Sequence, residues 1–527
     1  MSTLAAPGAR AFPMDDSYRF RWIIAITVTL ASILEILDTS IVNVAIPHMM
    51  GTLGATLDQI TWVSTGYIVA NVIVLPVTGW LSAYFGRRRY FAGSIALFTI
   101  ASILCGSAHS LTQLVLWRII QGLGGGALLS TSQAILYEVF PPEEYGQAMA
   151  IFGVGVMVGP TLGPTLGGYI TDAFSWPWIF YINVPFGILA FILSLSFIKN
   201  SRFQKRSEEI DWLGLFLLAL GIGTLQTMLE RGERLDWFQS KEIIAYTITS
   251  ITSLVWFTWH ELTTAHPVID LRILKNRQFA IGCILGAVLG VCLYATVFVL
   301  PVYLQQLLAY TANQTGLVIL PGAIASAVTM AAMSRTLGRV DGRRFAIVGA
   351  ILFGVAMWQW SRFTLDSGRG DFFWPLILRG IALGMVFIPL NNLAMAELPM
   401  ARIAAGTGFY NLCRQLGGSI GIAVTAQIVS HMVSANRAAL SEHVSAYDPV
   451  TMQRIERTVQ WLMLHGVGAA QARLRAIGMI AAEVQRQAAM ITFEHVFLLF
   501  GSLFIVSLPL IAMLRYRPGQ VRGGGAH

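Results

Sequence analysis

Long apolar stretches, separated by short polar connections, make up most of the chain. About twenty consecutive apolar residues form a helix that crosses a bilayer once, so each stretch is predicted to be a transmembrane helix. Fourteen such spans are predicted, near residues 22–46, 60–82, 90–108, 112–137, 147–171, 178–198, 211–229, 242–260, 279–302, 314–334, 344–362, 373–396, 403–430 and 492–514. The predicted fold class is therefore an all-α integral membrane protein.

The connection over about residues 431–490 is the one long interruption of this pattern. Its later apolar residues recur at helical spacing, which predicts an amphipathic helix leading into the last span. These residues are Leu474, Ile477, Ile480, Ala481, Val484 and Ala488. Such a helix would either pack on the outer surface of its own protein or offer a docking surface to a partner.

The composition agrees with a membrane protein. Of the 527 residues, 55% are hydrophobic and only 12% are charged, whereas a soluble protein carries roughly 25% charged residues. Residues 1–21 precede an apolar run that is too long for a signal peptide, so the first span is expected to stay uncleaved. Lysine and arginine gather in alternate connections, near residues 87–89, 199–206, 272–277, 335–344 and 515–522. The positive-inside rule places these connections and both termini in the cytoplasm.

The same composition excludes several classes of function. The net charge of +8 comes from basic residues at the ends of apolar segments, so no nucleic-acid partner is expected. The four cysteines lie inside apolar segments without paired spacing, so neither a disulfide framework nor a metal site is expected. They are Cys105, Cys283, Cys292 and Cys413. No persuasive Ser/His/Asp set is present, and neither an enzyme nor a cofactor is predicted.

An internal repeat divides the chain. The segment Gly79–Arg89 after the second span is echoed by Ser334–Arg344 after the tenth, and Trp117–Gly122 is echoed by Leu378–Gly380. The members of each pair lie eight spans apart. This spacing predicts two six-helix bundles separated by an inserted helix pair. The expected boundaries are 1–199 for the first bundle, 200–262 for the linker and inserted pair, and 263–527 for the second bundle.

Two carboxylates, Glu35 and Asp38, lie inside the first span, three residues apart and so on one face of the helix. An ionisable residue at membrane depth is costly and usually functional. Burial disfavours a charged carboxylate and neighbouring acids titrate as a pair, which suits a proton carrier. Asp38 could instead brace its helix. Arg118 in the fourth span needs a partner, and a tie to either acid is expected.

The fifth span has a glycine on one face every fourth residue. Small residues let a neighbouring helix approach closely, and proline bends a helix by removing a backbone donor. The motif residues are Gly155, Gly159, Pro160, Gly163, Pro164, Gly167 and Gly168. A close, bent contact of this kind is expected at a rocking interface between the bundles, or it is static packing.

Four motifs, in this order and spacing, resemble the EmrB/QacA-type fourteen-span drug/proton antiporters of the major facilitator superfamily, most closely the EmrB branch. They are Leu37–Pro47, Gly79–Arg89, Arg118 with Gln121-Gly122, and Gly155–Gly168, and residues 176–185 fit as well. The resemblance covers essentially the whole chain. It implies the major facilitator fold and alternating access. Two departures are Ala83, where an aspartate is usual, and Glu35, which lies outside the usual pattern.

The resemblance assigns roles to these residues. It implies proton coupling by Asp38 and Arg118, with Glu35 beside them, and gating by the fifth-span motif. In the loop after span two it implies gating by Gly79, Gly86, Arg87 and Arg88, which also fix topology. Polar and aromatic residues inside spans are candidate substrate contacts: Asn43, Tyr67, Asn71, Gln133, Tyr294, Phe298, Asn391, Asn392, Tyr410, Asn411 and Arg414. Arg379 is expected to be mainly structural.

The function implied by the resemblance is proton-coupled export of hydrophobic or amphipathic compounds across a bacterial inner membrane. The EmrB branch works with a periplasmic adaptor protein and an outer-membrane channel, so these are the expected partners. The proton gradient, rather than a cofactor, would supply the energy. A specific metabolite or siderophore exporter of the same fold is an alternative, and a transport-derived sensor or channel is another.

Overall fold

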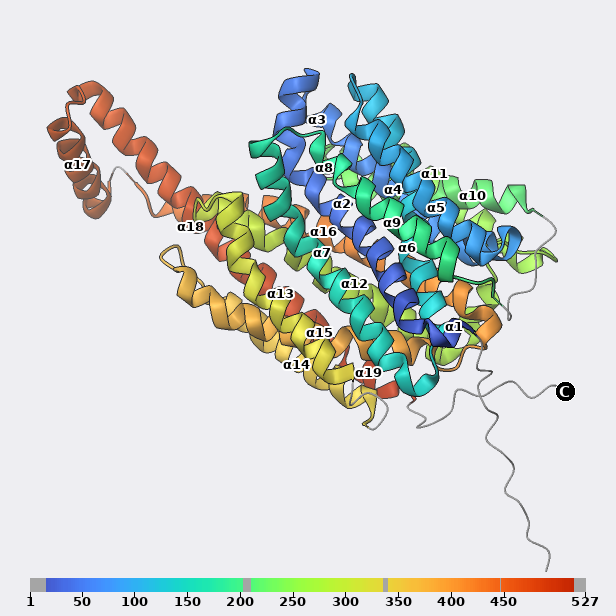
Figure 1. Ribbon diagram of the computed structural model, residues 1–527. Coiled ribbons are helices and arrows are strands. Elements are labelled where there is room, and N and C mark those ends of the chain that lie inside the picture. The colour runs from blue at the N-terminus through green and yellow to red at the C-terminus, as the bar shows by residue number, and fades with distance from the viewer. Residues whose placement is uncertain (1–15, 202–209, 335–339, 446, 516–527) are drawn as a thin grey trace, which may run out of the picture.

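The computed structural model describes residues 16–201, 210–334, 340–445 and 447–515. These residues form helices joined by short turns, and most of the helix axes run in a common direction (Figure 1). The first half of the chain, called the N-half below, contains α1 (Asp16–Arg19), α2 (Arg21–Leu53), α3 (Leu57–Ile60), α4 (Trp62–Phe85), α5 (Arg87–Gly106), α6 (Leu111–Val139), α7 (Tyr145–Ala173), α8 (Trp178–Tyr181) and α9 (Asn183–Phe197).

Two helices, α10 (Trp212–Arg231) and α11 (Lys241–Thr263), follow as the insert. The C-half then contains α12 (Arg277–Val302), α13 (Ala312–Ser334), α14 (Gly342–Trp360), α15 (Arg369–Met395), α16 (Ile403–Glu442), α17 (Pro449–Leu464), α18 (Ala469–Val506) and α19 (Leu508–Met513). In the described part of the chain, every predicted span coincides with a helix. The all-helical membrane architecture is therefore confirmed.

The number of membrane spans is smaller than the number of helices. Among the described residues, eleven helices are long and apolar enough to cross a membrane, and the bent α7 raises the number to twelve. The helices α11 and α14 do not meet that criterion. The predicted total of fourteen spans, the cytoplasmic placement of the termini and the three domain boundaries all remain predictions.

The internal repeat appears in the packing of the two halves. In the N-half, α2 packs on α7, α4 on α6, and α5 on both α6 and α9. In the C-half, α12 packs on α16, α13 on α15, and α14 on both α15 and α18. In each half the first helix thus meets the fifth, the second meets the fourth, and the third meets the fourth and sixth. Corresponding residues of the two halves can be compared on this basis.

The connection over 431–490, predicted as one long loop with an amphipathic helix at its end, is helical over most of its length. The helix α16 continues to Glu442, and α17 and α18 form a helical hairpin that projects from one end of the bundle (Figure 1). Asp448 starts α17, because its carboxylate accepts hydrogen bonds from the backbone N–H groups of Val450 and Thr451. An extended helix satisfies its own backbone groups, which an irregular loop of this length would leave to water.

The predicted amphipathic helix leading into the last span exists as the first part of α18, but only the end of its expected apolar face is buried, at Ala488, while the beginning is exposed. Leu474 is 76% exposed and Ile477 is 49% exposed. The face that packs against α17 is made of small residues, Ala472 and Ala476, which meet Leu462. The alanines form this contact because their small side chains let the two helices of the hairpin approach closely.

The two halves meet along two seams, α7 against α13 and α4 against α16. Glycine makes the second seam possible. A Cβ atom on Gly79 would lie 2.7 Å from the backbone nitrogen of Ala405, and one on Gly408 would lie 2.5 Å from the carbonyl oxygen of Leu75. Any side chain at either position would therefore collide with backbone atoms of the other half.

The insert lies beside the second seam and touches both halves. Its helix α10 packs on α4 and on α16. Gln226 donates a hydrogen bond of 2.7 Å to Ser419 of the C-half, and Arg231 forms an ion pair of 3.0 Å with Asp58 of the N-half. Leu217, Leu218 and Ile222 of α10 share a buried apolar cluster with residues of α4.

Candidate functional site

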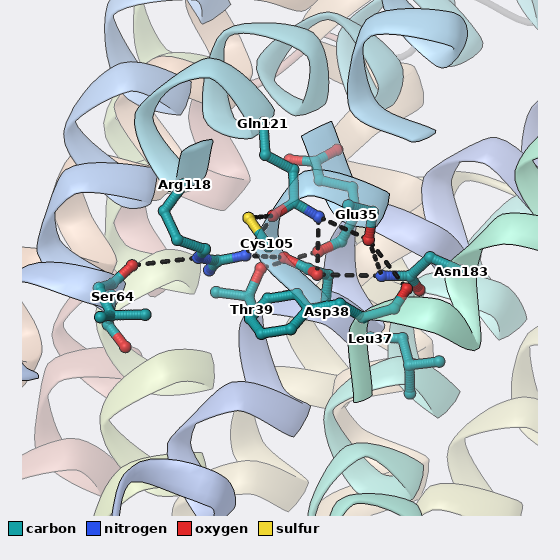
Figure 2. A network of polar contacts seen from close by, with 12 residues as sticks. Glu35, Leu37, Asp38, Thr39, Ser64, Cys105, Arg118, Gln121 and Asn183 are labelled. Carbon is teal, nitrogen blue, oxygen red and sulfur yellow. Dashed lines mark hydrogen bonds and ion pairs between the residues drawn. The ribbon is translucent and has the colours of Figure 1, made fainter. Parts of the chain in front are cut away.

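Asp38 of α2 lies at the centre of a buried polar network inside the N-half (Figure 2). Its Oδ2 atom forms an ion pair with Arg118 of α6. Its Oδ1 atom accepts hydrogen bonds of 3.0 Å from the side-chain amides of Gln121 and Asn183. Asp38 is 0% exposed and Arg118 is 1% exposed. The predicted tie between Arg118 and the first span is therefore present, and Asp38 is the acid that makes it.

Arg118 is fixed on several sides. Its Nε atom donates to the carbonyl oxygen of Val63 at 3.1 Å, and its Nη1 atom also donates to Gln121 Oε1 at 2.7 Å. Its guanidinium carbon lies 4.1 Å from the ring centre of Tyr67. A cation over an aromatic face is stabilised by the ring quadrupole. These contacts hold one end of α6 against α2 and α4.

Three residues of this network had not been assigned to the site from the sequence. Gln121 and Asn183 belong to motifs that carried the family resemblance, but no role had been given to them. Ser102 of α5 accepts hydrogen bonds from both of these amides and donates one of 2.9 Å to the carbonyl oxygen of Phe180. A lone serine in an apolar helix gives no signal of its own in the sequence, so Ser102 could not have been found.

Glu35 occupies a separate network one turn earlier in α2. Its Oε1 atom accepts a hydrogen bond of 2.9 Å from the side chain of Asn71 in α4, and its Oε2 atom accepts one of 3.2 Å from the backbone N–H of Leu129 in α6. Glu35 is 6% exposed. The two acids thus share a helix face, but each has its own set of donors.

Arg414 of α16 approaches Glu35 from the C-half, close enough for the two charges to interact. Its guanidinium carbon lies 5.4 Å from the ring centre of Phe387, and the phenol of Tyr294 is beside it. Arg414 is 1% exposed, yet its Nε and Nη1 atoms have no hydrogen-bond partner among the described residues. An acid of one half and a cation of the other thus face each other across the interface.

A second polar group joins the two halves directly, and it is called the inter-half bridge below. Asn411 of α16 donates to Gln133 of α6 at 2.7 Å and to Ser130 at 3.3 Å. Gln133 in turn donates to Asn391 of α15 at 3.3 Å. Tyr137 completes the bridge with a hydrogen bond of 2.9 Å to Asn392. All these residues lie at the end of the bundle where α6 and α15 finish and α16 begins.

The structure buries most of the predicted substrate contacts, but not all of them. The exceptions are Asn43 and Phe298. Asn43 is exposed and accepts a hydrogen bond of 3.2 Å from Ser64. Phe298 is 40% exposed on α12. The remaining candidates are buried or half-buried: Tyr67, Asn71, Gln133, Tyr294, Asn391, Asn392, Tyr410, Asn411 and Arg414.

The glycine face of α7 makes the predicted close approach, but to a different partner. Cβ atoms added to Gly155, Gly159, Gly163 and Gly167 would all meet α2, for example at 2.7 Å from Ile36 for Gly159 and 1.9 Å from Ser40 for Gly163. The expectation of a contact between bundles is corrected, because α2 belongs to the same half. The inter-half contact of α7 is made instead by other residues, such as Thr165 against Gly316 of α13.

The two prolines of this motif accompany a bend. The axis of α7 turns by 42° between the segments Tyr145–Met157 and Leu162–Ala173, and Pro160 and Pro164 lie inside the helix. Proline removes a backbone hydrogen bond and crowds the preceding turn. The predicted bend is therefore observed. Gly168 is outside the close contact, since a Cβ there would have one neighbour, at 3.9 Å.

The predicted loop Gly79–Arg89 is almost entirely helical. The helix α4 continues to Phe85, α5 begins at Arg87, and Gly86 alone links them with a φ of 83°, where a side chain is disfavoured. Arg87 is 5% exposed and forms an ion pair with Glu138 of α6. It also donates to the carbonyl oxygen of Lys199, while Arg88 donates to that of Leu195. These arginines tie α5, α6 and the end of α9 together.

Two halves whose long helices pair in the same order, buried charges and an insert define a multi-pass membrane transporter fold. A family model for the Major Facilitator Superfamily matches residues 28–422. The chain belongs to the major facilitator superfamily, as its motifs predicted.

Relatives agree with this assignment. The multidrug export protein EmrB of Escherichia coli K12 is 35% identical over 505 residues, which covers 95% of this chain and 97% of that protein. The fatty acid resistance protein FarB of Neisseria gonorrhoeae is 34% identical over 517 residues, covering 98% and 100%. The human organic anion transporter MFSD10 (TETRAN) has the same fold, with a TM-score of 0.58 at 14% identity over 92% of this chain and 99% of that one.

Proposed function

We propose that the protein is a proton-coupled exporter of hydrophobic or amphipathic compounds, with a multidrug range, in a bacterial inner membrane. The length and level of the identity to EmrB and FarB support the substrate class. The proton gradient is the energy source in this proposal, and it amounts to about 2.3 kcal/mol per 100 mV for one proton. No cofactor is required.

The ion pair between Asp38 and Arg118 is the observation that carries the proposal. A buried ion pair gains little net stability over apolar packing, so its presence in the N-half suits a switching role. Protonation of Asp38 would remove the counter-charge of Arg118, whose remaining partners are the neutral groups Val63 and Gln121. Because these partners come from α4 and α6, a change in protonation at Asp38 would alter the packing of three helices at once.

Alternating access then requires that the halves separate at one end and close at the other. The inter-half bridge and the glycine contacts of Gly79 and Gly408 join the halves at a single end of the bundle. With the predicted orientation, this end faces the cytoplasm. The conformation described here would therefore be closed toward the cytoplasm, and the bridge would open to admit a substrate.

Transport by the reconstituted full-length protein tests the function. Liposomes with an imposed pH gradient are given a panel of amphipathic cations, neutral compounds and anions, and proton movement is followed with a pH-sensitive dye. We expect substrate-stimulated proton movement. Its absence with every compound of the panel, in protein that is folded, would contradict proton-coupled export.

The variant Asp38→Asn tests the coupling residue. We expect proton-driven transport to fall to the background level. Because Arg118 loses its counter-charge, the free energy of unfolding should also drop by about 3–5 kcal/mol, so thermal unfolding is measured in parallel. The control is Asp172→Asn, since Asp172 is 78% exposed, and it should transport normally. Normal transport by Asp38→Asn would remove Asp38 from the mechanism.

The hairpin of α17 and α18 is the proposed docking surface for a periplasmic adaptor protein, which would pass substrates to an outer-membrane channel. With the predicted orientation, the hairpin lies outside the membrane on the periplasmic side. Large apolar side chains are exposed on it, among them Leu464 at 85%, Leu474 at 76% and Trp461 at 52%. Exposed apolar groups of this size on an extramembrane hairpin favour a protein partner.

A further inference from the structure

The C-half repeats the buried arginine of the N-half but not its acid. Arg118 lies in the fourth helix of the N-half and contacts Asp38 in the first. Arg379 lies in α15, the fourth helix of the C-half, and its Nη2 atom donates a hydrogen bond of 2.7 Å to Thr296 of α12, the first helix. At the same place in the repeat, a neutral hydroxyl therefore stands where the N-half has a carboxylate.

Two buried N–H groups, one on Arg379 and one beside it, have no acceptor among the described residues. Arg379 is 7% exposed, and its Nε atom has no hydrogen-bond partner in the described part of the chain. The ring of Trp360 of α14 lies 5.6 Å from the guanidinium carbon. Trp360 is 0% exposed, and its Nε1 atom also lacks a partner. The hydroxyl of Thr296 already donates to the carbonyl oxygen of Cys292 at 2.6 Å.

The contacts that Arg379 does make are too weak to offset the burial of its charge. Removing an ion from water costs several kcal/mol even after relaxation. A cation–π contact contributes about 2 kcal/mol when it is desolvated, and a typical hydrogen bond contributes about 1 kcal/mol net. Arg118 offsets this cost with Asp38, whereas among the described residues Arg379 has no ion-pair partner. An anion beside Arg379 would supply the stabilisation that its other contacts do not.

We propose that a small monovalent anion, chloride under ordinary conditions, binds beside Arg379 and Trp360 and fills the role that Asp38 has in the N-half. The unpartnered groups are N–H donors, which suit a halide. The side chains of Thr296 and Trp360 are fully buried, which favours an anion of one atom over a larger one. The site is separate from the proposed proton-coupling network and does not depend on the proposed transport function.

Halide-dependent thermal unfolding of the full-length protein in detergent tests the site. Unfolding is followed by tryptophan fluorescence in sodium chloride, sodium bromide and sodium gluconate at equal ionic strength. A ligand that binds the folded state raises the midpoint in a saturable way. We expect chloride and bromide to raise it by about 2–4 °C over gluconate. Equal midpoints in chloride and gluconate would overturn the proposal.

Variants at Thr296 locate the effect. Thr296→Asp supplies the missing carboxylate, so its midpoint in gluconate should rise above that of the natural protein and its response to halides should disappear. Thr296→Asn has nearly the same shape without the charge, and it should keep the response. A halide response that persists in Thr296→Asp would place the halide elsewhere and overturn the proposal.

Arg379→Gln provides an independent measurement, because it removes the cation. Its midpoint should be the same in chloride and in gluconate. A response of natural size in this variant would also overturn the proposal. If Arg379→Gln does not fold, the comparison of Thr296→Asp with Thr296→Asn still decides the question, since both variants retain the arginine.

Discussion

At the residue scale, the buried charges near the centre of the protein have unequal numbers of partners. Asp38 accepts hydrogen bonds from three side chains that belong to α6 and α9. Arg414, by contrast, has two buried nitrogen atoms, Nε and Nη1, without an acceptor in the part of the chain that the structure describes. A fully satisfied polar network rigidifies its surroundings, and a partly satisfied one is costly. The Asp38 network is therefore suited to hold one state of the N-half, while Arg414 retains donors that a ligand could use.

The variant Asn183→Ala tests this view of the Asp38 network. It removes one donor to Asp38 and one to Ser102, and a hydrogen bond to a charged group contributes about 1.5–3 kcal/mol. We expect the free energy of unfolding to fall by about this amount and proton-coupled transport to slow several-fold. Thermal unfolding and liposome transport are measured together.

A matched control is Asn436→Ala, which removes one hydrogen bond of 3.0 Å to Thr492 far from Asp38. It should lose some stability but keep its transport rate. If Asn183→Ala transports at the natural rate, Asn183 has a structural part only.

At the scale of elements, the glycine face of α7 explains how the N-half can pack so tightly. The Cβ positions of four glycines are occupied by side chains and backbone of α2. A glycine at every fourth position predicts that another helix approaches closely, but it does not identify that helix. The partner is set by the order of helices in the bundle, which depends on all six spans. This is why the close approach and the bend were predictable and the partner was not.

The pair Gly163→Ala and Gly168→Ala tests the packing of α7 on α2 with a single methyl group. A Cβ on Gly163 would lie 1.9 Å from Ser40 Oγ and 2.6 Å from its Cβ, whereas one on Gly168 would have one neighbour, at 3.9 Å. Overpacking costs about 1–3 kcal/mol. We expect Gly163→Ala to lower the unfolding midpoint and to reduce transport, and Gly168→Ala to leave both unchanged. Equal behaviour of the two variants would show that the contact is not tight.

The helices themselves were largely readable from the sequence, because each is a long apolar run of the length of a bilayer. The exceptions have physical reasons. The segment Gly79–Arg89 looks like a loop because it is polar and basic, but a single Gly86 with a positive φ suffices to turn the chain. The segment 431–490 looks like a loop because it is polar, but water outside the membrane is compatible with polar helices as well as with loops.

At the scale of the whole molecule, the inter-half bridge forms where the two halves meet, and it was the least predictable part of the site. Arg118 and Asp38 each belong to a motif that carried the family resemblance, so a contact between them could be expected. Gln133, Asn391 and Asn411 were recognised only as polar residues inside spans, and nothing in one sequence tells that they bond to one another across the halves. The four hydrogen bonds between α6 and the C-half in the inter-half bridge all join residues more than 200 positions apart in the chain.

The hairpin of α17 and α18 leads to a prediction at this scale. The double variant Leu464→Glu and Leu474→Glu places charge on the exposed apolar surface. We expect adaptor binding, measured by cross-linking and co-purification, to fall at least tenfold and export by intact cells to fall with it. Transport in liposomes, where no adaptor is present, should be unchanged.

A control for added negative charge on the hairpin is Gln471→Glu, at an exposed polar position of α18. It should bind the adaptor normally. Undiminished adaptor binding by the double variant would exclude this apolar surface as the docking site, and loss of liposome transport would indicate that the hairpin supports the fold instead.

The insert makes the two seams mechanically unequal. Along the seam of α4 and α16, the helix α10 links the two halves. It has a hydrogen bond to Ser419 of the C-half and, through Arg231, an ion pair with Asp58 of the N-half. Among the described residues, the insert packs on α4 and α16 but not on α7 or α13. A rocking motion that separates the halves must therefore bend or move α10, and α10 lies on one side of the molecule only. Relative movement of the halves should thus include a lateral tilt toward the insert as well as a symmetric opening.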